Sequence, residues 1–210
     1  MPVKTDKREY RKFEGMEVRT AENGAKVVEG YATTFNQPYQ LWRDRDITVN
    51  EQVDPRAFDE TDMSDVIMQY DHEGRVFARI SNGTLRLEAD DHGLKVVADL
   101  GGTEIGRQLF EEINGGYTNK MSFGFTVTGE EKKRTEEDGR VTILRTITKI
   151  GKLYDVSAVS LPANDATEIS SRMIGDGLIS EAEKEIQAEE DRRRRIGEIR
   201  NILKGDKPDA

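Results

Sequence analysis

Between Tyr10 and Pro162 the chain alternates short apolar–polar stretches with turn residues, a pattern typical of β-strands. Two pairs of these stretches flank turn-forming residues and predict hairpins. The first pair covers residues 11–19 and 26–34 around Glu22-Asn23-Gly24, and the second covers 84–89 and 94–100 around Asp90-Asp91-His92-Gly93. Further strands are predicted at residues 66–70, 121–128, 141–150 and 154–161.

Two stretches inside this β region lack a clear strand pattern. Residues 37–46, which include the single tryptophan Trp42, are interpreted as a loop. Residues 130–140 are almost entirely charged and are interpreted as an insertion between two strands.

One helix is predicted inside the β region. Thr103 is a suitable N-cap, and Ile105, Leu109 and Ile113 recur at the i, i+4, i+8 spacing that places them on one helix face. Asn114-Gly115-Gly116 then ends the helix.

After Pro162 the pattern changes to a charged helix. Ser180-Glu181-Ala182-Glu183 matches a capping box, and the helix is expected to run to about Lys204. Its apolar positions are sparse, although Ile196, Ile199 and Leu203 share one face. We therefore expect a β domain over residues 1–168 and an exposed or partner-bound helical arm over residues 169–210.

Composition narrows the function classes. The chain has 210 residues with 32 basic and 41 acidic side chains, a net charge of -9, so it is a poor candidate for binding nucleic acid. It has no cysteine, which removes disulfides and thiolate chemistry and fits a reducing compartment. No apolar run approaches the ~18 residues of a membrane span. The N-terminus lacks the apolar region of a signal peptide, so secretion by that route is not expected.

The strand over residues 121–128 carries the first candidate for chemistry. Alternation puts Met121, Phe123 and Phe125 on one face and Ser122 with Gly124 on the other, so the serine is expected to face outward. Gly124 would leave room there for the backbone of a substrate. A polar residue on a solvated strand face has the same pattern and is the commoner case.

Two further residues complete a possible acyl-transfer set. His72 follows an apolar strand, although a histidine there is more often structural or exposed. Asp155 lies in a largely apolar strand, where its partner would be either a histidine or an arginine of a neighbouring strand. Asp71 and Ser157 are weaker candidates for the third role, and His92 is best explained as a turn residue.

Cofactor chemistry has little support in the sequence. Two histidines without cysteines do not make a metal-ligand set, and we expect no metal or other cofactor. The Gly-Gly pairs at 101–102 and 115–116 flank the predicted helix and do not form a phosphate-binding loop.

Five blocks of sequence, in order, resemble the prohead maturation proteases of tailed bacteriophages, which are similar in fold to the herpesvirus assemblin proteases. The blocks are Val27-Val28-Glu29-Gly30-Tyr31-Ala32-Thr33-Thr34-Phe35-Asn36, Glu51-Gln52-Val53-Asp54-Pro55-Arg56-Ala57-Phe58, Gln69-Tyr70-Asp71-His72, Lys120-Met121-Ser122-Phe123-Gly124-Phe125 and Leu153-Tyr154-Asp155-Val156-Ser157-Ala158-Val159-Ser160-Leu161-Pro162-Ala163-Asn164. Together they run from about Val27 to Ala166.

The resemblance implies a fold, a function and a site. The fold would be mainly β with helices, a small antiparallel β-barrel of the assemblin type. The function would be that of a serine endopeptidase with Ser122 as nucleophile, His72 as base and Asp155 as the group that orients it. Assemblins use a second histidine in that third role, but this chain has no histidine after Ser122, so a carboxylate is the better candidate.

The same resemblance implies a biological setting. The partners would be the phage major capsid protein and scaffold, a homo-oligomer is possible, and the location would be the host cytoplasm, inside the assembling prohead. Proteases of this kind also tend to cleave themselves. The alternative function is a non-enzymatic head-assembly or scaffolding protein on the same fold.

Overall fold

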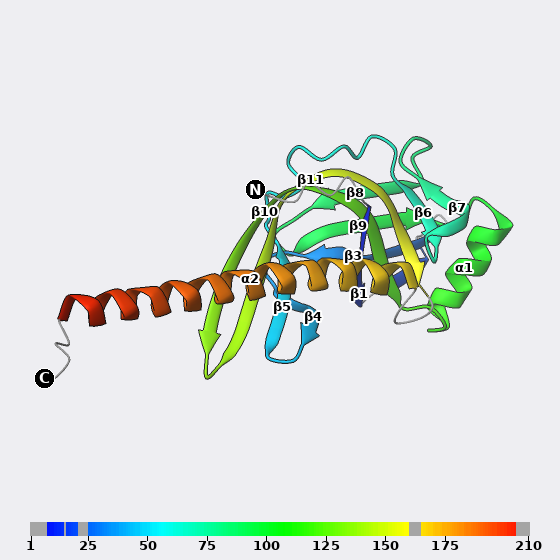
Figure 1. The fold of residues 1–210 in the computed structure, drawn as a ribbon. Helices are drawn as coiled ribbons and strands as arrows, with labels where there is room; N and C mark the ends of the chain where they lie inside the picture. Colours follow the sequence, from blue (N-terminus) through cyan, green and yellow to red (C-terminus); the bar gives the residue numbers. More distant parts are fainter. Residues whose placement is uncertain (1–7, 15, 21–24, 160–164, 205–210) are drawn as a thin grey trace, which may run out of the picture.

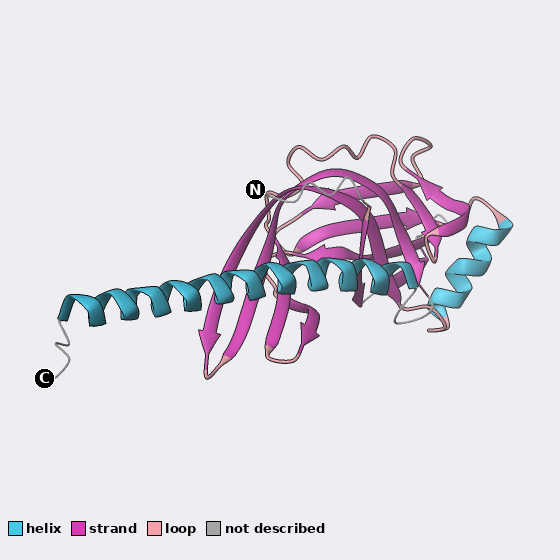
Figure 2. Cartoon of the chain, in the orientation of Figure 1, coloured by secondary structure: helices cyan, strands magenta, loops and turns pink. Residues whose placement is uncertain are grey.

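The computed structural model describes residues 8–14, 16–20, 25–159 and 165–204, and this part of the chain is mainly β with two helices (Figures 1 and 2). The elements are β1 (Glu9–Glu14), β2 (Met16–Thr20), β3 (Lys26–Thr34), β4 (Tyr39–Asp44), β5 (Ile47–Val53), β6 (Ile67–Tyr70), β7 (Glu73–Arg79), β8 (Leu85–Ala89), β9 (Gly93–Asp99), α1 (Glu104–Asn114), β10 (Lys120–Glu137), β11 (Arg140–Val159) and α2 (Asp165–Lys204).

These strands form two sheets. The larger has the order β1-β10-β11-β5-β4, with β6 beside β11 and β7 beside β6, and the smaller has the order β2-β3-β9-β8. The larger sheet is mixed, because β11 pairs in parallel with β5 along its first half and with β6 near its end. These two pairings depart from the predicted antiparallel arrangement, whereas the other strand pairs are antiparallel. The sheets do not close on one another, so the predicted barrel is not confirmed.

The hairpin predicted over residues 84–100 pairs as expected, whereas the strand predicted over residues 11–19 is divided, because residues 11–14 belong to β1 and pair with β10. β2 pairs with β3, and β8 pairs with β9, each antiparallel. The predicted turn at Glu22-Asn23-Gly24 lies outside the described residues. In the second turn the Asp90 carboxylate accepts hydrogen bonds from the backbone N–H groups of His92 and Gly93, which explains the tight reversal there.

The apolar face predicted for residues 121–127 is confirmed as part of the core. Met121, Phe123 and Phe125 are fully buried, and the two phenylalanine rings stack with centroids 4.4 Å apart. Burial of each such ring contributes about 1.5–3 kcal/mol to the free energy of folding. This core fixes which face of β10 turns inward, and hence which face carries Ser122.

Two stretches that lack a strand pattern are nevertheless strands. Residues 39–44 form β4 along β5, where Leu41 is buried, so the predicted loop is wrong. The charged stretch 130–140 continues the β10–β11 hairpin to a turn at Asp138-Gly139, both with positive φ, so the predicted insertion is also wrong. Long-range pairing orders these segments although their own composition does not favour strands.

Helix α1 confirms its predicted capping. The Thr103 side chain accepts a hydrogen bond from the Gly106 backbone N–H at 3.0 Å, and the helix ends at Asn114, before Gly115. Leu109, Phe110 and Ile113 bury the inner face of the helix against the core.

Helix α2 begins fifteen residues before the predicted start at Ser180. Leu178, Ile179 and Ala182 are buried against an apolar patch formed by Leu41, Val49, Val141 and Ile143. This part of the helix is therefore not an exposed arm. The C-terminal end of the helix extends beyond both sheets (Figure 1), and Ile196 and Ile199 are exposed there. Nothing is described of the side chain of Leu203. The division into domains at residues 168 and 169 stays a prediction.

A buried charge network lies among β1, β5 and β11. Glu51 accepts from Arg11 Nε and Arg145 Nη1, each at 2.5 Å, and from the Tyr39 hydroxyl at 2.5 Å. Glu9 accepts from both arginines at 2.7–3.0 Å. Burial alone would raise the pKa of Glu51, but the two guanidinium groups more than offset this and lower the pKa to about 2. The network therefore holds Glu51 ionised in the interior.

We predict that Glu51→Gln destabilises the fold by about 3–5 kcal/mol, because two buried arginines lose a carboxylate partner. Since the folded-state pKa is depressed, the contribution of Glu51 is complete above the ordinary carboxyl pKa and is lost as pH falls through about 2. Urea unfolding at neutral and acidic pH measures this, with exposed Glu60→Gln as the control that changes stability by less than about 0.5 kcal/mol. Equal stability of the two variants would contradict the assignment.

The contact between α2 and β4 gives a second prediction. A Cβ at Gly175 would lie 2.3 Å from the Trp42 Cβ, whereas a Cβ at Gly177 would meet nothing within 4 Å. Gly175→Ala should push the helix from β4 and shift the fluorescence of the single tryptophan toward that of an exposed ring. Gly177→Ala should leave the fluorescence unchanged and stabilise the helix by up to about 1 kcal/mol. Identical spectra for both variants would refute this packing.

Candidate active site

His72 is positioned by a two-residue hairpin turn between β6 and β7. Asp71 and His72 have φ values of 49° and 61°, the left-handed conformation of a type I′ turn. The Asp71 N–H donates to the Ala158 carbonyl at 2.9 Å, which ties the turn to β11. Sequence reasoning expected a histidine at a strand end and missed this turn, which contains neither Asn nor Gly. Strained backbone of this kind is often found at functional sites.

Ser122 lies near the start of β10, opposite Lys12 of β1 and Ser157 of β11. The alternation of β10 puts it on the face away from Met121 and Phe123, as predicted. However, Ser122 has 0% exposed surface, which contradicts the interpretation as a polar residue on a solvated strand face.

Asp155 lies on β11 and is also fully buried. Its Oδ1 accepts hydrogen bonds from His72 Nδ1 at 2.5 Å and from the Ser157 hydroxyl at 2.8 Å. Its Oδ2 accepts from Arg8. The sequence left open whether this carboxylate would be paired with a histidine or with an arginine, and in the structure it is paired with both.

The three candidate residues form one continuous hydrogen-bonded chain. His72 Nε2 lies 2.7 Å from Ser122 Oγ, while Nδ1 of the same ring contacts Asp155. The His72 side chain is 4% exposed, so the ring is enclosed. In this geometry the Asp155 carboxylate holds a proton on Nδ1, which leaves Nε2 free to accept the proton of the Ser122 hydroxyl.

Gly124 has a different role from the one inferred from the sequence. A Cβ at this position would lie 2.6 Å from Asp155 Oδ2, 2.8 Å from Arg8 Nε and 2.9 Å from Tyr10 Cε1. The space beside Gly124 is therefore filled by the residues that surround the carboxylate. The expectation that a substrate backbone approaches there is wrong.

Sequence reasoning missed two residues at the site. Arg8 contacts Asp155, and the Tyr10 ring packs edge-on against the His72 ring with centroids 4.4 Å apart. No local pattern marks them, because Arg8 and Asp155 are 147 residues apart in the sequence. Among the weaker candidates, Ser157 donates to Asp155.

The remaining histidine lies elsewhere. His92 sits in the β8–β9 turn and packs against the Tyr31 ring, with centroids 4.5 Å apart. Among the residues that the structure describes, no cluster of three or more His, Asp or Glu side chains could hold a metal ion. Likewise, no helix in the described ranges is both long and apolar enough to cross a membrane.

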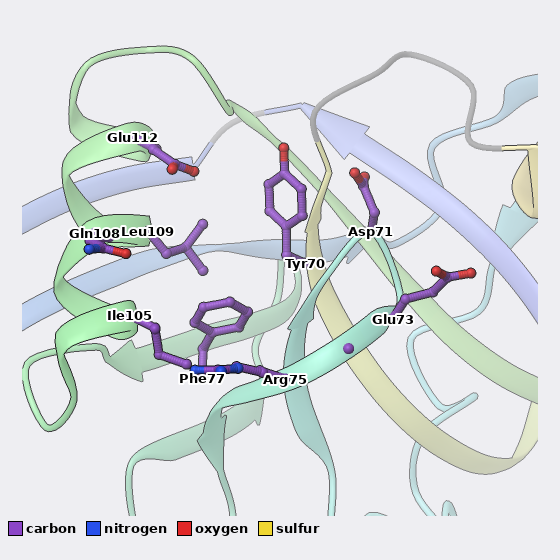
Figure 3. Close-up of a pocket in the computed structure, with 10 residues that line it drawn as sticks. Tyr70, Asp71, Glu73, Arg75, Phe77, Ile105, Gln108, Leu109 and Glu112 are labelled. Carbon is purple, nitrogen blue, oxygen red and sulfur yellow. The ribbon is translucent and has the colours of Figure 1, made fainter.

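A pocket of about 630 Å³ lies between α1 and the β6–β7 hairpin (Figure 3). Side chains of α1 point toward the hairpin across this space. Asp71, the neighbour of His72 in the turn, lines the pocket, so the cavity borders the turn that holds the histidine. Its lining combines the apolar side chains of Tyr70, Phe77, Ile105 and Leu109 with the polar side chains of Asp71, Glu73, Arg75, Gln108 and Glu112.

Comparisons with known proteins give the family of the chain. A solved structure titled "Structure of the bacteriophage T4 capsid assembly protease, gp21" is similar with 12% sequence identity and a TM-score of 0.42, covering 73% of this chain and 99% of that one. No curated protein matches the chain. The family model described as caudovirus prohead serine protease matches residues 14–177, which is most of the sequence. The chain belongs to the caudovirus prohead serine protease family.

Proposed function

We propose that this protein is a serine endopeptidase that cleaves scaffold and capsid proteins, and itself, during maturation of the phage head. Family membership supports a serine protease of the assembling head. The single observation that carries the assignment of residues is the hydrogen-bonded chain Ser122–His72–Asp155. A non-enzymatic scaffolding protein would have no need of these buried, hydrogen-bonded Ser, His and Asp side chains.

The proposed reaction follows from the positions of the hydrogen-bonding atoms. Ser122 Oγ attacks the peptide carbonyl carbon as its proton moves to His72 Nε2. When the C–N bond breaks, His72 returns that proton to the leaving amine. A water molecule then attacks the acyl-enzyme with His72 again as base, which releases the acid and restores Ser122. The Asp155 carboxylate accepts from His72 Nδ1 and stabilises the transient imidazolium.

The pocket beside the His72 turn is suited to binding part of a peptide substrate. Its volume is within the range of ordinary ligand sites, and its lining combines apolar and polar side chains. We propose that it receives a side chain of the bound peptide next to the scissile bond. The helical segment from residue 169 onward is proposed to dock to scaffold or to a second copy of the chain through its exposed distal part.

The triad proposal predicts that Ser122→Ala abolishes cleavage of a co-expressed capsid precursor without unfolding the chain. His72→Ala should lower kcat by about 10⁴-fold or more, because the nucleophile loses its base. His92→Ala is the matched control, since that ring lies in a turn and contacts Tyr31. Electrophoresis of the precursor and circular dichroism of each variant measure both effects. Normal processing by Ser122→Ala would overturn the assignment.

For the pocket, we predict that Gln108→Trp raises KM while kcat changes little, because the indole fills space meant for the peptide. Asn114→Trp provides the control on the same helix, since this exposed residue does not line the pocket. Steady-state cleavage of a peptide copied from the precursor junction measures both constants. If the two variants have the same KM, the peptide does not use this pocket.

A further inference from the structure

The N-terminal residues Arg8 and Tyr10 lie against the candidate triad, although the family match begins only at residue 14. Tyr10 of β1 packs edge-on against the His72 ring, and Arg8, just before β1, reaches the Asp155 carboxylate. These two residues lie on the outer face of β10, above Gly124, whose missing side chain leaves room for both. The family core therefore receives two contacts from a segment outside it.

Arg8 is held more firmly than an ordinary terminal arginine. Its guanidinium lies over the Tyr154 ring at 4.4 Å and over the Tyr10 ring at 5.4 Å. Its Nε is buried and has no hydrogen-bond partner within the described residues. Such a group is partly desolvated, so its attraction to Asp155 is stronger than that of an exposed pair.

The hydrogen bonds of Asp155 are divided between its two oxygens. Oδ1 accepts from His72 and Ser157, whereas Oδ2 accepts from Arg8. A carboxylate that is held at both oxygens cannot rotate about its Cβ–Cγ bond without losing a charged partner. Arg8 thus keeps Oδ1 directed at His72 Nδ1.

We propose that Arg8 is a positioning residue of the active site, which locks the Asp155 carboxylate in the orientation that holds the His72 tautomer. The inference rests on the proposed roles of His72 and Asp155. It adds a residue from the N-terminal segment to a site otherwise formed by the family core.

The proposal has a consequence for protonation. The groups in contact with the His72 ring or its carboxylate are Arg8 and Tyr10 from the N-terminal segment, Ser122 from β10 and Ser157 from β11, and the Tyr154 ring lies against Arg8. Loss of Arg8 removes a positive charge near the imidazole and should therefore move the titration of His72 to higher pH. At the same time the Asp155 carboxylate should lose its fixed alignment with His72 Nδ1, which weakens their hydrogen bond.

The first experiment needs no substrate. The chain has two histidines, so nitrogen-15 NMR of the imidazole rings follows His72 with His92 as an internal control. Arg8→Gln should move the His72 titration to higher pH and weaken the downfield signal of its Nδ1–H, while His92 stays unchanged. Arg8→Lys should restore both values toward wild type. Unchanged His72 signals in folded Arg8→Gln would overturn the proposal.

The second experiment measures turnover of the precursor-junction peptide by the full chain. Arg8→Gln should lower kcat by about 10²-fold with KM unchanged, and the acidic limb of its pH–rate profile should move to higher pH. Exposed Arg56→Ala serves as the control. Gly124→Ala, which crowds Arg8 and Asp155 from below, should also lower kcat without raising KM. A rise in KM alone, or unaltered kinetics, would refute a positioning role.

The two experiments separate this inference from the proposed function. If the wild-type chain cleaves no peptide, the protease proposal fails, but the NMR titration still tests whether Arg8 controls the His72–Asp155 pair. If Ser122→Ala abolishes cleavage and Arg8→Gln leaves kcat and the titration of His72 intact, only the role of Arg8 is wrong.

Discussion

The antiparallel ladder between β10 and β11 is the interaction on which the rest of the structure depends. Its register sets Ser122 opposite Ser157 and Gly124 opposite Asp155, so the nucleophile candidate and the carboxylate lie on the same face. The other edge of β11 accepts β5 and then β6, and β6 leads directly into the turn that carries His72. A shift of this ladder by one residue would reverse the faces of all these side chains.

Side chains of β1 alternate between two faces, so this strand contacts both the interior and the candidate active site. Glu9 and Arg11 point inward, where they join Glu51 and Arg145 in the buried network. Tyr10 lies on the opposite face, against His72. The network fixes β1 against the sheet, and this in turn keeps the preceding residue, Arg8, over Asp155. Charges that stabilise the interior therefore also hold residues that line the candidate site.

The distal half of the β10–β11 hairpin and α2 depend on each other. Lys132 pairs with Glu181 at 2.6 Å, and Arg134 pairs with Glu189 at 3.4 Å. These exposed pairs contribute little individually. The buried contacts of Leu178, Ile179 and Ala182 provide most of the attachment, and the charged pairs align the helix along the strands. The helix is therefore continuous with the protease fold near its start and extends away from it near its end.

The sequence by itself determined the features that depend on near neighbours. The β8–β9 hairpin, the Thr103 cap of α1 and the inward face of Met121, Phe123 and Phe125 follow from turn chemistry, capping and alternation. The residue types, together with the family resemblance, also singled out Ser122, His72 and Asp155 as candidates. Each of these inferences depends either on residues a few positions apart or on the five sequence blocks that resemble a known family.

Only the tertiary structure decided the features that depend on distant pairing. β4 and the charged end of the β10–β11 hairpin are strands because neighbouring strands and α2 cover them, not because of their own composition. The parallel pairing of β11 and the burial of Ser122 are likewise invisible in the sequence. His72 meets Asp155 across 83 residues and Arg8 meets the same carboxylate across 147, and no local propensity encodes contacts over such separations.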